Sequence, residues 1–273
     1  MSPQNPLVLI RGGGDLSTGV AFRLWRAGFD VVVTEVAEPL AVRRLVALAE
    51  AVYAGEAEIE GELKGVRIDN ASEARSVLRS GRIPVLVDPD LSCREVLQPV
   101  AVVDGRMRKR PPEGAWAASP IVIGLGPGFT AGRDCHAVVE TNRGHHMGRV
   151  YWKGQAEADT GIPETVGGHD VDRVLRAPCD GILTAEVHLA EPVKAGSHLA
   201  RVGDGLVTAP FDGVLRGMVH DGVHVSGGMK IGDLDPRGVP DFCRQISDKS
   251  LAVGGGVLEA LLTQQDIRGR LGG

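Results

Sequence analysis

Aliphatic runs alternate with amphipathic segments along the first half of the chain. The aliphatic runs occupy 7–10, 31–33, 83–88, 100–105 and 121–123. The amphipathic segments, with apolar residues at helical spacing, occupy 15–28, 41–55 and 71–78. Continuous apolar runs are typical of strands that are buried on both faces of a parallel sheet. The alternation therefore predicts an α/β fold with a Rossmann-like, doubly wound parallel sheet.

The first aliphatic run ends at a turn of three consecutive glycines. Its spacing, Gly12-x-Gly14-x-x-Ser17, is close to the dinucleotide-binding fingerprint, and Glu35 ends the next predicted strand 21 positions after Gly14. Glycines let the backbone approach a phosphate, the amides of a helix start point at it, and an acid at that distance can accept hydrogen bonds from ribose hydroxyls. The residues assigned to this cofactor site are Gly12, Gly13, Gly14, Ser17, Thr18 and Glu35.

Asp15 does not fit a simple anion site. A carboxylate at the start of a helix repels an anion unless it caps the helix or holds a metal. Asp15 is therefore kept as a candidate catalytic residue. Two interpretations of the turn stay open, a phosphate-binding loop and a purely structural turn.

A second glycine loop follows the run at 121–123 and is richer in polar groups. Loops at the carboxyl ends of strands bind ligands in open α/β sheets, so we expect it to face the same crevice as the first loop. Its candidate cofactor-binding residues are Gly124, Gly126, Gly128, Thr130 and Arg143. Its candidate catalytic residues are Asp134, His136, Glu140 and His145. No HExxH or nucleophile-elbow spacing occurs, so their roles stay open and no metal site is assigned.

The chain changes character near residue 175, where an internal duplication begins. Residues 177–199 align with 209–231 at an offset of 32, and each copy opens with the pattern APxDG. Short alternating runs between Gly, Pro and Asp turns predict all-β structure. The repeat resembles the barrel-sandwich hybrid of biotinyl and lipoyl domains. The hairpin between the copies lacks the lysine that carries a prosthetic group in those domains. We therefore expect a docking or interaction module, or a lid over the first domain.

Three domains follow from these patterns. The first is a Rossmann-like cofactor-binding domain over 1–165, and the second is the repeat domain over 170–238. The third segment, 240–273, begins a helix near Ser247 and carries three consecutive glycines at 254–256. Glycines inside a helix indicate a close approach to another backbone. We expect this helix to pack back on the first domain.

Composition narrows the class of protein. The 273 residues are 43% hydrophobic and 24% charged, with a formal net charge of −5, which is unlike a general nucleic-acid binder. The basic cluster at 106–110 is interpreted as a solvated loop. No signal peptide and no membrane-length apolar run is recognised, and the four cysteines form no CxxC pair. We therefore expect a cytoplasmic protein with reduced thiols, in which no membrane or nucleic acid is a partner.

Four motifs together give the chain a family resemblance. "IRGGGDLSTGVAFRLWRAGF", "GLGPGFTAGRDCHAVVETNRGHHMGRV", "DTGIP" and "AVGGGVLEAL" are similar to the YqeB-type accessory proteins of selenium-dependent molybdenum hydroxylases. The first domain also resembles the Rossmann domain of XdhC-type maturation factors. The resemblance implies a role in maturing a molybdenum hydroxylase, with that enzyme as a client protein. It implies no reaction and no catalytic residue.

Three functions remain open from the sequence. The leading hypothesis is an accessory protein that binds a phosphate-bearing cofactor, either the molybdenum cofactor or a nucleotide such as NAD, and presents the β module to a client. The second is an NAD-dependent oxidoreductase, because the charge of Glu35 disfavours the 2′-phosphate of NADP. The third is a non-enzymatic scaffold whose glycine loops are only structural. A homo-oligomer is compatible with each.

Overall fold

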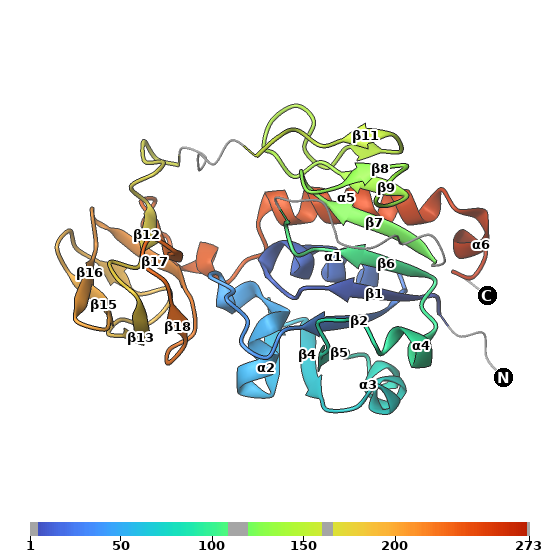
Figure 1. Cartoon of the computed structure of the whole chain (residues 1–273), viewed down its shortest axis with the longest axis horizontal. Coiled ribbons are helices and arrows are strands. Elements are labelled where there is room, and N and C mark those ends of the chain that lie inside the picture. The colour runs from blue at the N-terminus through green and yellow to red at the C-terminus, as the bar shows by residue number, and fades with distance from the viewer. Residues whose placement is uncertain (1–4, 109–119, 160–165, 272–273) are drawn as a thin grey trace.

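A large sheet of nine strands forms the centre of the computed structural model, which describes residues 5–108, 120–159 and 166–271 (Figure 1). The strand order is β10-β9-β7-β6-β1-β2-β5-β4-β3. Their bounds are β1 Leu7–Arg11, β2 Asp30–Glu35, β3 Glu56–Ile59, β4 Leu63–Ile68, β5 Ile83–Val87, β6 Ala101–Asp104, β7 Ile121–Leu125, β9 Ala137–Val139 and β10 Val150–Tyr151. The last two residues of the basic cluster and most of the DTGIP motif lie outside the described residues.

The large sheet is mixed rather than parallel. Strand β10 pairs antiparallel with β9 at one edge, and β3 pairs antiparallel with β4 at the other. The expected continuous helix over 41–55 is also wrong. That segment holds two 3₁₀ turns, η1 (Arg44–Val46) and η2 (Leu48–Glu50), and a single α-helical turn, α2 (Ala51–Ala54).

Tertiary contacts explain the missing helix, and the local sequence explains the antiparallel edge at β3. The Leu48 amide donates to Thr18 Oγ1 and the Ala49 amide donates to the Gly13 carbonyl, both at 2.9 Å, which ties this segment to the glycine turn instead of to its own helix. Directly afterwards, exposed and buried residues alternate along β3, the pattern of a strand with one face in water. Gly61, with φ of +71°, then allows the tight turn into β4.

Two longer helices cover one face of the large sheet. They are α1 (Asp15–Arg26) and α5 (Asp248–Leu262), followed by the short α6 (Gln265–Arg268). Val8 and Ile10 of β1 share one apolar core with them, whereas Leu7 and Leu9 belong to the core on the opposite face. That second face is covered by η3 (Ala71–Glu73), α3 (Ala74–Arg79) and α4 (Arg94–Leu97).

Helices α1 and α5 lie side by side in parallel, because Gly19 lies against Ser250 and Arg23 lies against Gly254. A Cβ at Gly19 would be 2.6 Å from the Ser250 carbonyl oxygen, and a Cβ at Gly254 would be 2.7 Å from the Gly19 carbonyl oxygen. Only glycine permits this approach. Both helices consequently begin at the same end of the large sheet.

The repeat region, called the β module below, consists of two four-stranded antiparallel sheets. Their orders are β12-β19-β17-β14 and β16-β15-β13-β18. The bounds are β12 Val174–Arg176, β13 Gly181–Ala185, β14 Pro192–Val193, β15 His198–Val202, β16 Gly205–Thr208, β17 Gly213–Met218, β18 His224–Val225 and β19 Lys230–Asp235. Each sheet takes strands from both copies, and the two sheets share one apolar core.

The expected fold class, a Rossmann-like parallel sheet plus a barrel-sandwich hybrid, is therefore wrong. The protein instead has a nine-stranded mixed sheet and two four-stranded antiparallel sheets. A further pair, β8 (Thr130–Ala131) with β11 (Gly154–Gln155), extends the loops beyond the large sheet. In the part of the chain that the structure describes, no helix is both long and apolar enough to cross a membrane.

The β module contacts the large-sheet domain through residues 42–53, which end within α2. Gly217 lies against the Val42 backbone, and Arg44 Nε donates to the Met218 carbonyl at 2.8 Å. The Tyr53 and His220 rings are stacked, with centroids 4.0 Å apart. The turn η4 (Pro240–Cys243) and the residues after it lead back to α5, as Figure 1 shows.

Candidate functional site

The first glycine turn is occupied by its own chain. The Gly12 amide donates to the Thr34 carbonyl at 2.8 Å, and the Gly13 amide donates to Glu35 Oε1 at 2.9 Å. The second Glu35 oxygen accepts from the Val36 amide. Burial raises the pKa of Glu35, and these two hydrogen bonds oppose the shift. Both oxygens that we assigned to a ribose thus have donors within the protein.

The hydroxyls after the turn also serve the fold. Buried Thr18 donates to the Gly14 carbonyl at 2.9 Å and accepts from the Leu48 amide, while Ser17 Oγ donates to the Gly105 carbonyl at 3.3 Å. A Cβ on Gly13 would lie 2.9 Å from the Ala49 nitrogen. These contacts match the structural interpretation of the turn.

The glycines of the second loop make close internal contacts as well. A Cβ on Gly124 would collide with the Phe129 ring, one on Gly128 with the Arg108 carbonyl, and one on Gly126 would lie 2.7 Å from Thr141 Oγ1. Strand β6 separates β7 from β1, so the two glycine loops are not on neighbouring strands. Pro127 of the second loop nevertheless lines the same cleft as Asp15 and Leu16 at the start of α1.

The candidate catalytic residues of the second loop do not form one cluster. Asp134 accepts from the Thr130 amide and pairs with Arg133, which lowers its pKa chiefly through those Arg133 hydrogen bonds. Exposed His136 accepts from the Val122 amide through Nδ1. Among the described residues, no three His, Cys, Asp or Glu side chains lie together so as to hold a metal ion.

Glu140 and His145 have different surroundings. Glu140 is fully buried and accepts three backbone N–H bonds at 2.8 Å, from Thr141, Asn142 and Glu157, so it braces the loop after β9. His145 is exposed and its ring lies edge-on to His146. Neither position brings a reactive group to Asp15.

A cleft of about 1000 Å³ lies between the starts of α1 and α5 and the β module. We call it the basic cleft. Its basic lining residues are Arg43, Arg143, Arg173, Arg176, Arg216, Lys230, Arg237 and Lys249. Its acidic lining residues are Asp15, Glu157, Asp159, Asp233 and Asp248. In a chain of net charge −5, this concentrates positive charge around one cavity.

Arg43 brings the large-sheet domain to the basic cleft. Its side chain is 8% exposed and forms an ion pair with Asp15 at 3.3 Å. One terminal nitrogen donates to the Phe242 and Gln245 carbonyls, at 3.2 and 2.9 Å. The pairing of Asp15 with Arg43 neutralises the carboxylate that would repel an anion at the start of α1.

Two buried acids of β19 organise the cleft's arginines in the β module. Asp235 accepts two bonds from Arg237, at 2.9 and 2.6 Å, and Asp233 accepts from Arg173 at 2.8 Å. Burial alone would raise the pKa of Asp235, but the Arg237 hydrogen bonds hold it below its usual value. Arg216 reaches the same two acids only at 3.6 and 3.8 Å.

Arg143, which we assigned to cofactor binding, lines the cleft and binds both oxygens of Asp248 in the first turn of α5. These hydrogen bonds lower the pKa of Asp248 to about 2. Ser247 caps α5 by accepting from the Ser250 amide at 3.1 Å.

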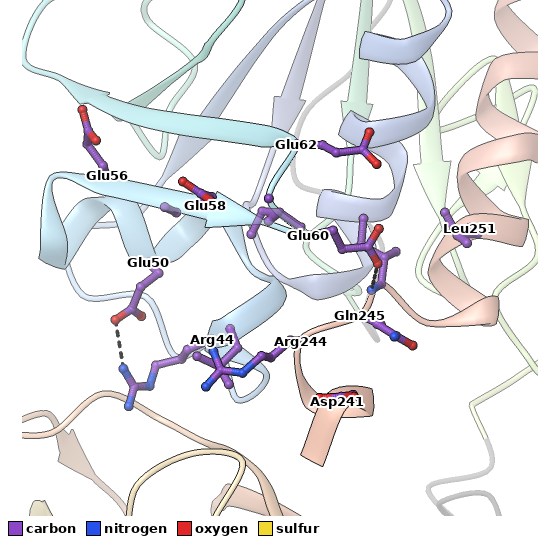
Figure 2. A pocket seen from close by; sticks show the side chains of 15 residues that line it. Arg44, Glu50, Glu56, Glu58, Glu60, Glu62, Asp241, Arg244, Gln245 and Leu251 are labelled. Carbon is purple, nitrogen blue, oxygen red and sulfur yellow. Dashed lines mark hydrogen bonds and ion pairs between the residues drawn. The ribbon is translucent and has the colours of Figure 1, made fainter. Parts of the chain in front are cut away.

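A second cavity, of about 920 Å³, lies beside β3 and is acidic (Figure 2). Its acids include Glu56, Glu58, Glu60 and Glu62. Glu58 pairs with Lys64, Glu62 pairs with Arg26, and Glu60 accepts from the Ile246 amide at 2.6 Å. Because these carboxylates are used within the fold, the basic cleft is the stronger candidate site.

Sequence reasoning missed most of the basic side chains in the cleft. Part of the lining could have been found by comparing the two repeat copies, because the copies differ in charge at two of the cleft positions. At the offset of 32, Arg216 stands where the first copy has Thr184, and Asp233 stands where it has Arg201. The second copy therefore carries an arginine where the first has a neutral residue, and an acid where the first has an arginine.

The chain is 46% identical over 266 residues to the uncharacterized protein YqeB of Escherichia coli (strain K12). The match covers 96% of this chain and 49% of the relative, so the chain spans about half the length of the curated relative it matches. This agrees with the YqeB-type resemblance of the motifs. It assigns no ligand, reaction or client, since the relative is itself uncharacterized. No protein-family model matches the chain.

Solved structures give only weak likenesses. The chain is 12% identical to the product-bound ectoine utilization protein EutE (DoeB) from Ruegeria pomeroyi, and 13% identical to an aspartoacylase family protein from Mesorhizobium loti MAFF303099. Each comparison covers 85% of both chains with a TM-score of 0.26. At that score neither likeness supports a fold or a function.

Proposed function

We propose that this protein is an accessory protein that binds a phosphate-bearing small molecule in the basic cleft, in the maturation of a selenium-dependent molybdenum hydroxylase. One observation carries the binding part. Eight basic and five acidic side chains line a single cavity in a chain whose net charge is negative. Arginine in particular suits phosphate, because its planar guanidinium donates two parallel hydrogen bonds.

The ligand's place differs from the one expected from the sequence. The glycine turns pack against neighbouring parts of the protein beside the cleft. The basic side chains that line the cleft supply the positive charge for the phosphate. A nucleotide and a molybdopterin each carry a phosphate that suits this surface. Hydride transfer from NAD has less support, because Glu35 already accepts two backbone hydrogen bonds and is not among the residues that line the cleft.

The first test identifies the ligand. Mass spectrometry of the purified protein should detect a copurifying phosphate-bearing molecule, and calorimetric titration with NAD, NADP, ATP and CTP should rank the candidates. If nothing copurifies and none of the four binds, the scaffold hypothesis replaces this one. A molybdenum hydroxylase captured by such a ligand-free protein would favour that hypothesis directly.

A matched pair of lysine variants tests the location. Lys230→Glu places a negative charge at the cleft, and we expect it to lower ligand affinity at least about tenfold through repulsion. Lys194→Glu is the control, because Lys194 is 84% exposed, pairs with Asp212 and does not line the cleft. Equal affinities of the two variants would place the ligand elsewhere.

A further inference from the structure

We propose that one phosphoryl group of the ligand binds between Arg43 and Arg216 and so links the large-sheet domain to the β module. This inference rests on the proposed function and names the subsite that recognises the ligand. Both arginines line the basic cleft, Arg43 from the segment before η1 and Arg216 from β17. The subsite would take a tetrahedral oxyanion, such as a terminal phosphate or one unit of a diphosphate.

The first support is the unused donor of Arg43. Its side chain is more than nine-tenths buried, and its two terminal nitrogens are held by Asp15 and by two backbone carbonyls. Within the described residues, the buried Arg43 Nε has no hydrogen-bond partner. The bonds of the terminal nitrogens fix the guanidinium in place, and the Nε–H is left without an acceptor among those residues.

The second support is the position of Arg216. Arg173 donates to Asp233 Oδ1 at 2.8 Å, and Arg237 donates to both oxygens of Asp235 at 2.9 and 2.6 Å. Arg216 keeps only ion pairs of 3.6 and 3.8 Å with these two acids. The Arg216 Nε is also buried without a hydrogen-bond partner in the described parts of the chain. A buried donor without an acceptor is costly, which is the expected state of a ligand-binding group before its ligand arrives.

The third support is that the two arginines oppose each other electrostatically. The pKa of Arg216 is lowered, first by burial and next by the positive charge of Arg43. Two like charges of different domains, facing one cavity, are stabilised by an anion that contacts both. A phosphoryl group has enough oxygens to accept from both guanidiniums.

Calorimetric titration with inorganic pyrophosphate tests the bridge. The proteins are the wild type, Arg43→Gln, Arg216→Gln and the double variant. A shared phosphoryl group predicts that each single substitution weakens binding about 30-fold. The double variant should then bind nearly as the singles do, because either substitution already breaks the bridge. Arg201→Gln is the control, since Arg201 is exposed and pairs with Glu186 away from the cleft.

A thermal melt without ligand shows whether the variants fold. Arg216→Gln should melt at or above the wild-type temperature, because it removes a buried and repelled charge while Arg173 and Arg237 keep their acids. Pyrophosphate should raise the wild-type melting temperature and leave that of Arg216→Gln nearly unchanged.

The outcomes separate this inference from the proposed function. Wild-type binding with unchanged affinity in both single variants would overturn the bridge and leave the cleft proposal standing. Losses that multiply in the double variant would overturn it too, because they indicate two separate anion sites. If the wild type binds neither pyrophosphate nor any nucleotide, the subsite and the phosphate-bearing ligand are both contradicted.

Discussion

The arginines of the basic cleft differ in how completely their donors are used. Arg237 holds both oxygens of Asp235, and Arg143 holds both oxygens of Asp248. Such two-pronged pairs fix loops and helix starts in place. Arg216 has only longer ion pairs, so it keeps hydrogen-bonding capacity for a ligand. Among the described residues, Arg216 is left with a free Nε donor because Arg173 and Arg237 already bind the carboxylates of Asp233 and Asp235 at short distance.

The Arg143–Asp248 pair predicts an acid-dependent loss of stability. The folded pKa of Asp248 is about 2 against 3.8 for the free group, so its ionised form stabilises the fold above pH 4 and this contribution disappears between pH 4 and 2. Asp248→Asn should therefore melt below the wild type at pH 5 to 7, with a difference that shrinks toward pH 2. Calorimetric melts at several pH values measure it.

Arg143→Gln provides the control for that titration. It removes the same pair from the other side, so its deficit should follow the same pH course. A deficit for Asp248→Asn that stays constant from pH 7 to 2 would show that helix capping, and not the ion pair, explains the effect.

Thiol reactivity should follow burial. Burial, together with the neighbouring Asp88 carboxylate, raises the pKa of Cys93 to about 12, and burial raises that of Cys135 to about 11. Because the thiolate is the reactive form, iodoacetamide at pH 8 should modify half-buried Cys179 before either of them. Peptide mass spectrometry over time gives the order. Early labelling of Cys93 in the folded protein would contradict it.

The sequence predicted two residues that line the cleft but not the arginines proposed to bind the ligand. Asp15 and Arg143 do line the cleft, because strand ends and helix starts are legible from apolar runs and glycines. Arg43 lies directly before the 3₁₀ turn η1 and Arg216 lies in strand β17, far away in the chain. Their meeting depends on how the β module docks, and no local pattern encodes that.

At the scale of elements, the parallel contact of α1 and α5 decides where the cleft forms. Close packing at Gly19 and Gly254 aligns the helices, so both N-termini line the same cavity. Each first turn carries an acid paired with an arginine, Asp15 with Arg43 and Asp248 with Arg143. The two helix dipoles thereby add positive potential to one place.

Two alanine substitutions test this contact. Gly19→Ala should lower the free energy of unfolding by about 1–3 kcal/mol, because the new Cβ would meet the Ser250 backbone. Gly255→Ala in α5 is the matched control. Its Cβ would meet no atom within 4 Å, so the better helix propensity of alanine should stabilise the protein by up to about 1 kcal/mol. Urea titrations measure both, and similar effects from the two variants would contradict tight packing at Gly19.

The sequence predicts strands correctly where both faces of the strand are buried. The runs that became β1, β2, β5, β6 and β7 are apolar along their central residues, as is typical of strands inside a sheet. The segment at 41–55 has the same apolar spacing as a helix, yet its Leu48 and Ala49 amides bond to Thr18 and Gly13. Those partners are some thirty residues away, so helical periodicity gave the wrong structure there.

At the scale of the whole molecule, docking of the β module sets the width of the basic cleft. A close approach occurs at Gly217, where a Cβ would lie 2.6 Å from the Val42 carbonyl oxygen. Arg44 and the Tyr53–His220 stack hold the same interface. Ligand contacts from both domains therefore depend on an interface outside the cleft.

Gly217→Ala should loosen that interface. We expect a larger radius of gyration by small-angle X-ray scattering and about tenfold weaker binding of pyrophosphate, because the two sides of the cleft lose their alignment. Gly227→Ala is the control, since its Cβ would find the nearest atom at an ordinary 3.4 Å. Unchanged scattering and affinity for Gly217→Ala would show that the interface absorbs a methyl group.

Helix α5 leaves the ribosome after the whole β module, and it covers part of one face of a sheet whose first strand was made some 240 residues earlier. Until then Val139 of β9 and the side of α1 that packs on α5 lack their cover. The nascent chain must finish the β module before this hydrophobic surface is shielded. A chain released after the β module, but before α5, would be an aggregation-prone intermediate. We therefore expect production of this protein to depend on chaperones that bind exposed apolar surface during translation.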